Sequence, residues 1–532
     1  MSFHSCEEEE QVPLTAYGGQ DHADDLDPVM VQLPKARGRP RHHRLSRAHV
    51  VTAIVALIAA IAGFLYGKSA SHPTISPAFS SALTGLTTLP HFKVNDPNEM
   101  FNYRWWTEAK LRSLVACIIR GDCAPNADKV RLNPNNSDAQ VIIVNTIHCQ
   151  WALDDDYHGG EGIWCLGMIR SWERQGYTVL HGGDLDWPFV YNIYRQIPDL
   201  VKVIVSDGGK DDRRGSHIHY LKSNDRPDGI PAWKFFLFSY YPTGMTTEIG
   251  PAWAVTAEPG RGGEYSIDID SRGVAWLTTG EEALDIRTKE HATRYTFLGY
   301  ELEPSAEETT FTDPNTRPYR VWIMAKYAKY FQPNDQQVYD LAFYDRAFEE
   351  LSKEFPGLEF VGGWKDERST EDQEKYPMPK HVKNLGVLNA TRFEDEFAQA
   401  RLMLGMGTPT LSPSPYRALA KAVAFGHPHK IKEGGTEWPF MQHDSMAKVP
   451  EPYVYQIEAY NYDSFVGAIR KALQSPPTRP LRFLRMRRDV ADKRLVDFVN
   501  ADWRGEAEVI LKARHNGHET QAGGTQLKDF VL

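Results

Sequence analysis

The stretch that decides the fold is residues 141–180, which read VIIVNTIHCQ WALDDDYHGG EGIWCLGMIR SWERQGYTVL. Its first four residues form a continuous β-branched run, which is typical of a strand buried on both faces of a sheet. After this run, apolar residues recur at the helical spacing i, i+3, i+4 and i+7, at Cys165, Met168, Ile169 and Trp172. This spacing predicts a helix over 161–175 that ends at Gly176, followed by a strand over 177–180.

The alternation of strand and helix continues along the chain. A helix is expected over 189–196 and a strand over 200–205, which completes a β-α-β-α-β unit with a parallel sheet. Residues 207–290 are rich in Gly, Pro and aromatic side chains and predict a less regular region. From Tyr319 the alternation restarts, with strands expected over 321–324, 358–361, 384–388 and 402–404 and helices over 338–355, 393–400 and 414–425. The sequence therefore predicts an α/β protein with two Rossmann-like doubly wound domains facing a cleft, and ligands outside the carboxyl ends of the strands.

The composition is that of a folded protein with more than one domain. The chain has 532 residues, 41% of them hydrophobic, and at about 150 residues per domain this length allows two or three domains. Its 60 Lys and Arg against 70 Asp and Glu give a net charge of −10. A dedicated nucleic-acid binder is usually basic, so we expect no nucleic-acid partner.

The amino-terminal region predicts a membrane anchor. Residues 1–34 contain eight acidic residues and no Lys or Arg, whereas residues 35–47 contain six Lys and Arg and no acid. An apolar run from Val50 to Tyr66 follows, and its helical length nearly matches a hydrocarbon core of about 30 Å. Cations before this run predict an uncleaved signal anchor with a cytosolic amino terminus and everything beyond Lys68 outside the cytosol. The alternative for the run is a buried core helix or a re-entrant segment.

The cysteines and sequons favour a luminal domain. Of the five cysteines, four lie beyond the apolar run, an even number that fits an oxidising compartment. Cys117 and Cys123 are close enough in sequence for a local loop, whereas Cys149 and Cys165 are either a second pair or two buried thiols. N-glycosylation sequons begin at Asn135 and Asn389, which is consistent with the same location.

Three segments carry a resemblance to a known family. Residues 295–300 read YTFLGY, residues 382–388 read VKNLGVL, and a third segment runs from LGMGTP at 404–409 to Phe425. In order and spacing they resemble the catalytic domain of glycosyltransferase family 18, the α-1,6-mannosylglycoprotein 6-β-N-acetylglucosaminyltransferases. The resemblance covers residues 290–500 and, more faintly, 139–185. It implies a GT-B-like fold after a single transmembrane helix and a stem, in a single-pass type II protein of the Golgi membrane.

With this resemblance the chain is divided into six parts. We expect a cytoplasmic tail over 1–48, a transmembrane signal anchor over 49–67 and a stem over 68–91. An N-terminal Rossmann-like acceptor domain over 92–290 and a C-terminal nucleotide-sugar-binding domain over 291–510 follow, and residues 511–532 are expected to form a flexible tail.

The resemblance implies an inverting transfer of GlcNAc from UDP-GlcNAc to the 6-hydroxyl of a mannose on an N-glycan, without a cofactor or bound metal. Such a reaction needs a base near the acceptor hydroxyl and positive potential around the departing diphosphate. The faint amino-terminal match places Glu161 at the family's catalytic glutamate; the alternative is an ordinary first-turn glutamate. Lys326 matches a family lysine near the diphosphate; the alternative is a surface cation.

The remaining site residues follow from the same match. A glycine turn and the helix start near Ser414 would offer close approach and free N–H groups to the donor, and aromatic or polar side chains before Glu161 would contact the acceptor sugar. The expected donor-binding residues are Lys326, Gly405, Gly407, Thr408, Ser414 and Arg417, and the expected acceptor-binding residues are Trp151, Asp154 and His158.

Two positions depart from the family pattern. The family carries glutamates where this chain has Leu411 and Arg417, so the carboxylates that would hold donor hydroxyls are replaced. This departure supports two alternatives: a catalytically altered GT-B protein that acts as a glycan-binding or scaffold module, and a GT-B transferase that uses another nucleotide sugar. The triplet Asp154–Asp156 is read as a solvated loop or acceptor contact rather than a metal site, and the His-X-His pairs at 217–219 and 427–429 lack a third ligand.

Overall fold

The structure is a computed structural model. It describes residues 107–108, 110–111, 114, 140–153, 160–183, 186–207, 217–239, 247–259, 265–271, 273–279, 295–302, 312–333, 337–432, 440–517 and 530–532. The predicted tail, anchor and stem lie outside these ranges, as do the Cys117–Cys123 pair, the Asn135 sequon, Asp154–Asp156 and His158. Within the described ranges, no helix has both the length and the apolar character needed to cross a bilayer.

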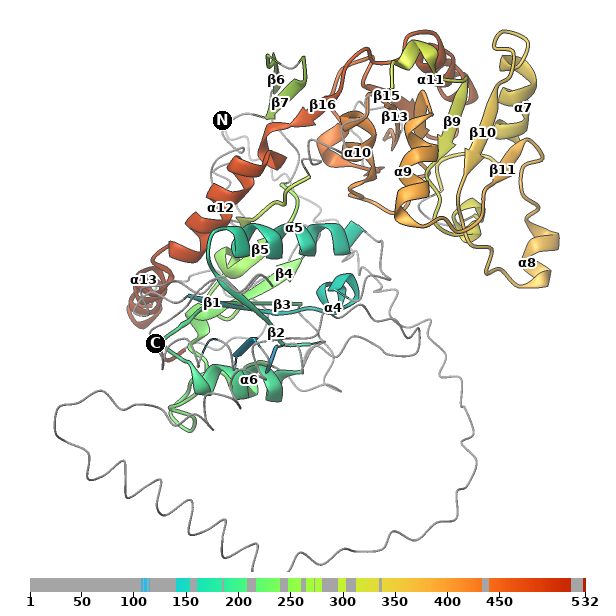
Figure 1. Ribbon diagram of the computed structural model, residues 1–532. Coiled ribbons are helices and arrows are strands. Elements are labelled where there is room, and N and C mark those ends of the chain that lie inside the picture. The colour runs from blue at the N-terminus through green and yellow to red at the C-terminus, as the bar shows by residue number, and fades with distance from the viewer. Residues whose placement is uncertain are drawn as a thin grey trace, which may run out of the picture. The chain divides into compact units, whose positions relative to one another are not determined.

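The first sheet has six strands in the order β2-β1-β3-β4-β5-β8 (Figure 1). Every adjacent pair is parallel. The strands are β1 (Val141–Asn145), β2 (Thr178–His181), β3 (Val201–Asp207), β4 (Phe235–Ser239), β5 (Ala254–Thr256) and β8 (Thr296–Phe297). Helices α4 (Ile147–Leu153) and α5 (Gly160–Arg174) connect β1 to β2, and α6 (Trp187–Gln196) connects β2 to β3. These elements confirm the predicted strands and helices over 141–205.

The region that we expected to be irregular supplies two of the six strands of this sheet. Strands β4 and β5 lie inside 207–290, and β8 lies beyond the predicted domain boundary at residue 290. The sequence of β4, FFLFS, has no β-branched residue, and β5 has only three residues. The aromatic side chains of β4 are fixed instead by packing: the ring of Phe236 lies 4.8 Å from that of Trp503.

The second sheet has the order β11-β10-β9-β12-β13-β14, and β15 also pairs with β13. Its strands are β9 (Arg320–Ile323), β10 (Glu359–Gly362), β11 (Val382–Asn384), β12 (Leu402–Leu404), β13 (Ala424–Lys430), β14 (Phe440–Met441) and β15 (Val454–Glu458). All pairs are parallel except β13 with β14. The parallel strands follow the doubly wound order 3-2-1-4-5-6, which confirms the predicted second Rossmann-like unit.

Helices α7 (Ala342–Leu351), α8 (Thr370–Lys375), α9 (Ala390–Ala398) and α10 (Ser414–Ala420) connect the strands of the second sheet. The helix predicted over 414–425 is too long, because Ala424 and Phe425 already belong to β13. The strand predicted over 384–388 begins and ends earlier, at β11. In β13 every residue from Ala424 to His429 is buried, so burial and pairing on both sides determine this strand despite its Gly and Pro.

The carboxyl-terminal segment returns to the first sheet. Helix α11 (Tyr462–Gln474) packs on the second sheet, a small third sheet joins β16 (Leu481–Phe483) to β7 (Ala275–Thr279) and β6 (Tyr265–Ile269), and α12 (Arg488–Asn500) and α13 (Trp503–His515) follow. The indole N–H of Trp172 on α5 donates to the Leu495 carbonyl on α12, at 3.3 Å. Helix α13 continues five residues into 511–532, the segment that the sequence predicted to be a flexible tail. Phe530 in the same segment is buried.

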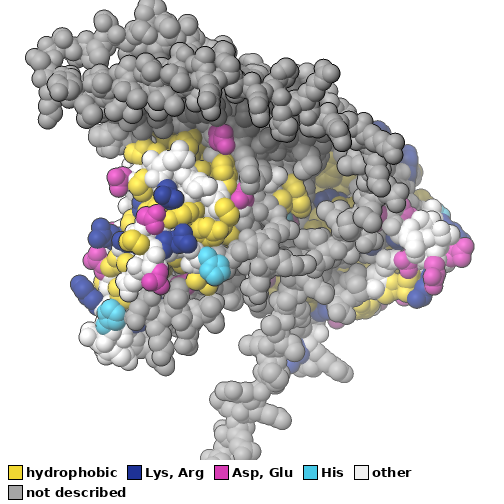
Figure 2. Space-filling model, turned by 90° about the horizontal axis from the view of Figure 1, so that it is seen from below, with side chains coloured by type: hydrophobic (Ala, Val, Ile, Leu, Met, Phe, Trp, Pro, Cys, Tyr) yellow, Lys and Arg dark blue, Asp and Glu magenta, His cyan; other side chains and the backbone are white. Residues whose placement is uncertain are grey.

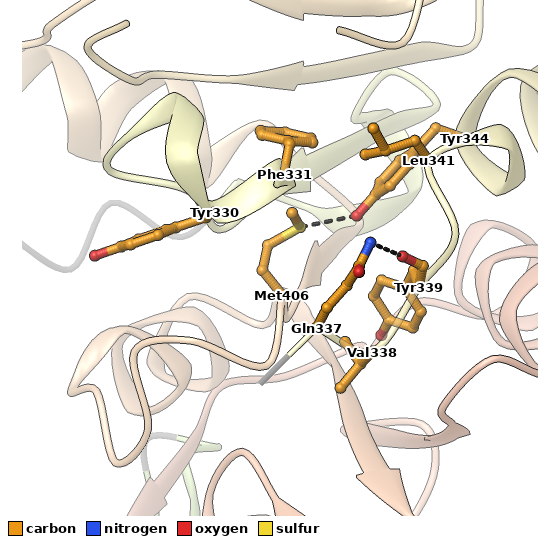
Figure 3. Close-up of a pocket in the computed structure, with 8 residues that line it drawn as sticks. All are labelled: Tyr330, Phe331, Gln337, Val338, Tyr339, Leu341, Tyr344 and Met406. Atoms are coloured by element: carbon orange, nitrogen blue, oxygen red, sulfur yellow. Dashed lines mark hydrogen bonds between the residues drawn. The ribbon is translucent and has the colours of Figure 1, made fainter. Parts of the chain in front are cut away.

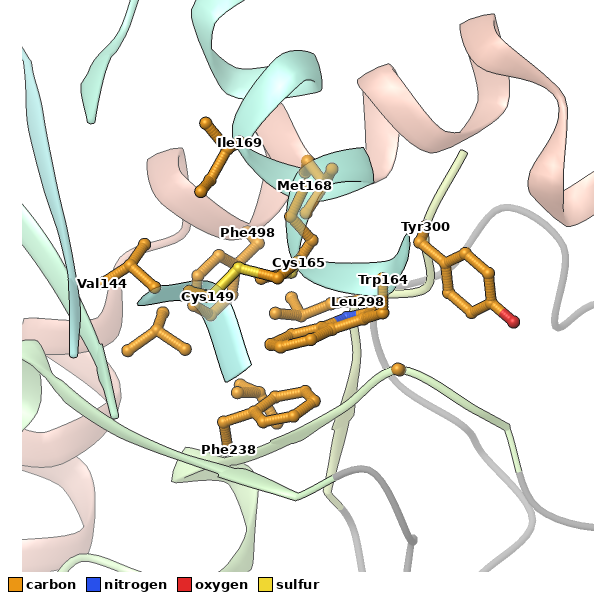
Figure 4. Packing of buried hydrophobic residues seen from close by; sticks show 14 of the residues in the cluster. Val144, Cys149, Trp164, Cys165, Met168, Ile169, Phe238, Leu298, Tyr300 and Phe498 are labelled. Atoms are coloured by element: carbon orange, nitrogen blue, oxygen red, sulfur yellow. A yellow bond between two sulfur atoms is a disulfide. The ribbon is translucent and has the colours of Figure 1, made fainter. Parts of the chain in front are cut away.

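A disulfide joins helices α4 and α5, which lie between β1 and β2. Cys149 on α4 and Cys165 on α5 are bonded, with their Cα atoms 5.3 Å apart, so the structure selects the bonded alternative for this pair. Figure 4 shows the bond among the buried side chains of Val144, Met168 and Phe498. The bond fixes the start of α5, and therefore Glu161, relative to the residues that follow β1.

The visible described surface is mixed in charge. On the face drawn in Figure 2, Lys and Arg atoms of the described residues are interspersed with Asp and Glu atoms and with hydrophobic side chains. They do not gather into one continuous basic patch on the described part of this face. The expectation that the protein has no nucleic-acid partner stays a prediction.

Candidate functional site

The second sheet has a topological switch point between β9 and β12. Chain connections leave these two neighbouring strands in opposite directions, β9 toward β10 and β12 toward β13. The Met324 amide donates to the Leu404 carbonyl at 3.0 Å, so the residues that follow both strands meet at one edge. Lys326 and the Gly405–Gly407 turn therefore follow neighbouring strands at the same sheet edge, where doubly wound folds bind their ligands.

Lys326 lies at this edge with its side chain exposed. Its ammonium nitrogen is 5.3 Å from the ring centre of Tyr327, and the nitrogen of Lys329 is at the same distance from that ring. Lys329 also approaches the carboxylate of Glu367, at 3.5 Å. Lys326 therefore places a positive charge beside the carboxyl end of β9, which suits a diphosphate.

A small pocket opens beside the same turn. Its cavity volume is about 10 Å³, which is room for about one water molecule. It is lined by residues from η9 (Ala328–Phe331), from the chain before α7, from α7 itself and from the glycine turn: Tyr330, Phe331, Gln337, Val338, Tyr339, Leu341, Tyr344 and Met406 (Figure 3). The Tyr344 hydroxyl donates to the Met406 sulfur at 2.8 Å, and the Gln337 amide donates to the Tyr339 carbonyl at 2.8 Å. The sequence analysis did not predict this pocket, although four of its aromatic residues lie within 15 positions of one another, from Tyr330 to Tyr344.

The glycine turn is braced by Gln442. Gly407 has a φ of 86°, which favours glycine, and its amide donates to the Gln442 side-chain oxygen at 3.1 Å. A Cβ on Gly405 would meet that oxygen at 2.2 Å and the Pro428 ring at 2.8 Å. We had expected Gly405 to let the nucleotide approach the backbone, but the space beside it is filled by protein. Thr408 follows in the same turn and is half-buried.

The two positions that depart from the family pattern have structural roles. Leu411 is 7% exposed with a φ of 55°, and its side chain belongs to the hydrophobic core. Arg417 on α10 forms an ion pair with Glu394 on α9, which also pairs with Lys421 at 3.1 Å. The guanidinium expected at the donor is therefore engaged by a protein carboxylate.

Ser414 begins α10, as predicted, and its amide donates to the Ser412 hydroxyl at 3.3 Å. One of the N–H groups expected to face the donor is therefore satisfied within the protein. The seven residues of this helix form less than two turns, so its position depends on tertiary contacts more than on its own hydrogen bonds.

On the first sheet, Glu161 is the second residue of α5 and is half-buried. Because α5 follows β1, its amino terminus lies toward the carboxyl edge of the sheet, where an acceptor-side residue was predicted. Trp151 on α4 is half-buried and its ring lies edge-on to His148, at 5.6 Å. Asp154 and His158, the other expected acceptor contacts, lie in the sequence between α4 and α5 and outside the described residues.

The last residues of β1 and β2, Asn145 and His181, are both buried polar side chains. His181 is buried at the end of β2, and its Nδ1 accepts from the Gly183 amide at 3.0 Å. Burial lowers the pKa of His181 to about 3, so the imidazole is neutral at physiological pH. Sequence reasoning missed this residue because a single histidine after a strand has no distinguishing pattern.

The His-X-His motifs form protein contacts. His217 Nε2 lies 2.9 Å from the buried Glu248 carboxylate, and His427 Nε2 accepts from the His443 amide at 3.0 Å. No group of three or more His, Cys, Asp or Glu residues is arranged for a metal ion in the part of the chain that the structure describes. The expectation of a metal-independent protein stays a prediction.

Comparisons with known proteins give only distant likenesses. No family model and no curated protein matches the sequence. Among solved structures, the O-GlcNAc transferase of Thermobaculum terrenum is 10% identical, with 79% of this chain and 74% of that chain covered and a TM-score of 0.36. An α-glucosyltransferase in complex with UDP-glucose and DNA is 8% identical over 70% of this chain and 98% of its own, with a TM-score of 0.35. Trehalose-6-phosphate synthase is 11% identical over 70% and 98%, with a TM-score of 0.33. Likenesses at this level carry no argument about activity, and the resemblance to glycosyltransferase family 18 stays a prediction.

Proposed function

We propose that the protein is a GT-B-type glycosyltransferase that uses a UDP-sugar as donor. The observation that carries the proposal is the switch point of the second sheet, where Lys326 and the Gly405–Gly407 turn meet beside an aromatic-lined pocket. Ligands bind at such switch points in doubly wound sheets, and a cationic edge suits a diphosphate leaving group. A second doubly wound sheet in the same chain supplies a separate surface for an acceptor.

The finer proposal follows the family resemblance. The donor is UDP-GlcNAc, the acceptor is the 6-hydroxyl of a mannose on an N-glycan, and the reaction occurs in the Golgi lumen with inversion at the anomeric carbon and without a metal. Glu161 takes the proton of the attacking hydroxyl while the anomeric carbon–oxygen bond to UDP breaks. The ammonium of Lys326 stabilises the negative charge that develops on the departing diphosphate.

A donor-binding screen on the purified protein tests this proposal. Wild type is titrated with UDP, GDP and their sugar conjugates, and UDP compounds should bind more tightly than GDP compounds. Lys326→Ala should weaken UDP binding by about tenfold. Lys329→Ala is the matched control, because it removes an equivalent cation from the same tyrosine ring at a position paired with Glu367. Equal losses in both variants, or no UDP binding by wild type, would contradict the proposed donor site.

A glycan-binding module without transferase activity is the second candidate function. The contacts of Leu411 and Arg417 favour it, because one side chain lies in the core and the other is paired with Glu394. Neither is thereby placed to hold the hydroxyls of a donor sugar. In this case wild type should bind N-glycans but no nucleotide sugar, and Lys326→Ala should leave glycan binding unchanged.

A further inference from the structure

Four buried side chains join the first sheet to α10, and we call them the Glu258 cluster: Glu258, Tyr300, Tyr416 and Arg485. Glu258 follows β5 and Tyr300 follows β8, the last two strands in the order of the first sheet. Tyr416 is on α10 and Arg485 is in η11 (Leu484–Met486). None of the four is more than 2% exposed. The cluster therefore connects elements that lie far apart in sequence.

The hydrogen bonds of the cluster run from Arg485 to Glu258. The Arg485 guanidinium donates to the Tyr416 hydroxyl oxygen at 2.7 Å, and the Tyr416 hydroxyl donates to the Glu258 carboxylate at 2.7 Å. Tyr300 donates to the other carboxylate oxygen at 2.9 Å. Tyr416 thus uses its hydroxyl as acceptor and as donor at once, which fixes it between two groups from different elements.

The charges of the cluster also balance. Arg485 lies 3.8 Å from the Glu258 carboxylate, and its guanidinium makes a second bond to the Ser445 hydroxyl at 2.8 Å. A buried ion pair adds little stability compared with apolar residues of the same volume, but removing one partner leaves the other charge unpaired. Such a chain of charged and hydroxyl groups tolerates only a narrow range of positions for Tyr416.

We propose that Glu258 and Tyr416 are positioning residues that hold α10, and with it the donor-side residue Ser414, in a fixed place relative to the carboxyl ends of β5 and β8. Because α10 has only seven residues, the helix depends on such contacts for its position. The kinetic consequence of this inference rests on the proposed function, but the effect on the helix itself does not. Loss of the cluster should loosen α10 and weaken donor binding, without removing a group that touches the donor.

Protonation of Glu258 should weaken the same contacts. One carboxylate oxygen would become a donor and would compete with a phenol hydroxyl that already donates to it. Other ionisable groups nearby are Asp444 in η10 (Asp444–Met446), His443, whose ring centre lies 4.9 Å from that of Tyr416, and Arg494 on α12. Burial lowers the pKa of His443 well below its usual value, so Glu258 is the group of this set that we expect to titrate near neutral pH.

Hydrogen exchange tests the effect on the helix. In the Tyr416→Phe variant only one hydroxyl is lost, and the backbone amides of α10 should exchange at least about tenfold faster than in wild type. Amides of α11 should be unchanged. The control is Tyr455→Phe, which removes a buried hydroxyl bonded to the Ser475 carbonyl at 3.2 Å. If α10 exchanges within about twofold of wild type in both Tyr416→Phe and Glu258→Gln, the inference is wrong.

Donor kinetics provide the second readout. In wild type the KM for the UDP-sugar should rise as the pH falls below about 7, whereas in Glu258→Gln it should be high throughout, because glutamine resembles the protonated carboxyl. The turnover number should change much less than KM in Tyr416→Phe, and Tyr455→Phe should resemble wild type in both. A wild type without transfer would contradict the proposed function and leave the hydrogen-exchange result to decide the inference. A wild type that turns over, with a pH-independent KM shared by Glu258→Gln, would contradict the inference alone.

Discussion

Replacement of Glu258 by glutamine should change how the stability of the protein depends on pH. Burial is the largest influence on this carboxyl and raises its pKa from the ordinary value of 4.5 to about 7, although Arg485 and the hydroxyls of Tyr416 and Tyr300 act in the opposite direction. Between these two pH values the folded protein keeps the proton that the unfolded chain has released. The stability gained from this proton is fully present below pH 4.5 and is lost as the pH rises through about 7.

The magnitude follows from the same two values. Each pH unit corresponds to about 1.4 kcal/mol, so the interval from 4.5 to about 7 corresponds to about 3 kcal/mol. Glutamine does not titrate, so the Glu258→Gln variant lacks this change. The free energy of unfolding of wild type minus that of the variant should therefore fall by about 3 kcal/mol between pH 4.5 and 7 and stay level above 7.

Urea denaturation of both proteins at several pH values, followed by tryptophan fluorescence, measures this difference. Glu350→Gln is a control of opposite sign, because hydrogen bonds from Arg470 and Tyr462 lower the pKa of Glu350. Its stabilising effect should be present above the unfolded pKa and should be lost as the pH falls. A difference between wild type and Glu258→Gln that stays constant from pH 4.5 to 7, or that rises, would refute the reasoning, because Arg485 would then keep Glu258 ionised throughout.

Three further predictions concern the proposed catalytic and donor residues. Glu161→Gln should reduce transfer by about 10² to 10⁴ and leave donor affinity unchanged, and a variant within about threefold of wild type in steady-state kinetics would exclude Glu161 as the base. Transfer should persist in EDTA, and a loss of activity restored by manganese would instead indicate a metal site. Gly405→Ala should lower stability by about 1–3 kcal/mol in thermal or urea unfolding because its Cβ would collide with Gln442 and Pro428; an unchanged midpoint would show that the turn can rearrange.

Much of the fold could be predicted from local pattern. Buried β-branched runs such as 141–144 and helices with regular apolar spacing such as α5 are recognisable because pattern and burial agree. The strands β4 and β13 were not predicted, because their residue patterns are not typical of buried strands. The sequence of β4 is mostly aromatic, and β13 contains Gly and Pro. In both, neighbouring strands and packing determine the conformation, and these contacts are remote in sequence.

The site was predicted less completely than the fold. Lys326 and the glycine turn follow strands, and parallel topology brings strand ends together, so their meeting could be expected. The roles of Gly405 and Arg417 could not, because Gln442 and Glu394 reach them from other elements. Glu258 was missed for the same reason: its partner Tyr416 is 158 positions further along the chain.

Because α12 and α13 pack on the first sheet, this sheet can complete its folding only late in translation. The rings of Phe498 and Trp503 pack against Phe236, and Arg514 donates to the carbonyls of Glu248 and Ile249. These side chains leave the ribosome after the whole second sheet, so the part of the chain made first cannot complete its core until translation is almost finished. All strands of the second sheet are synthesised before α12 and α13, the helices that complete the core of the first sheet. A nascent chain arrested before residue 488 should therefore keep the first sheet open to proteases or chaperones, although its strands have already been made.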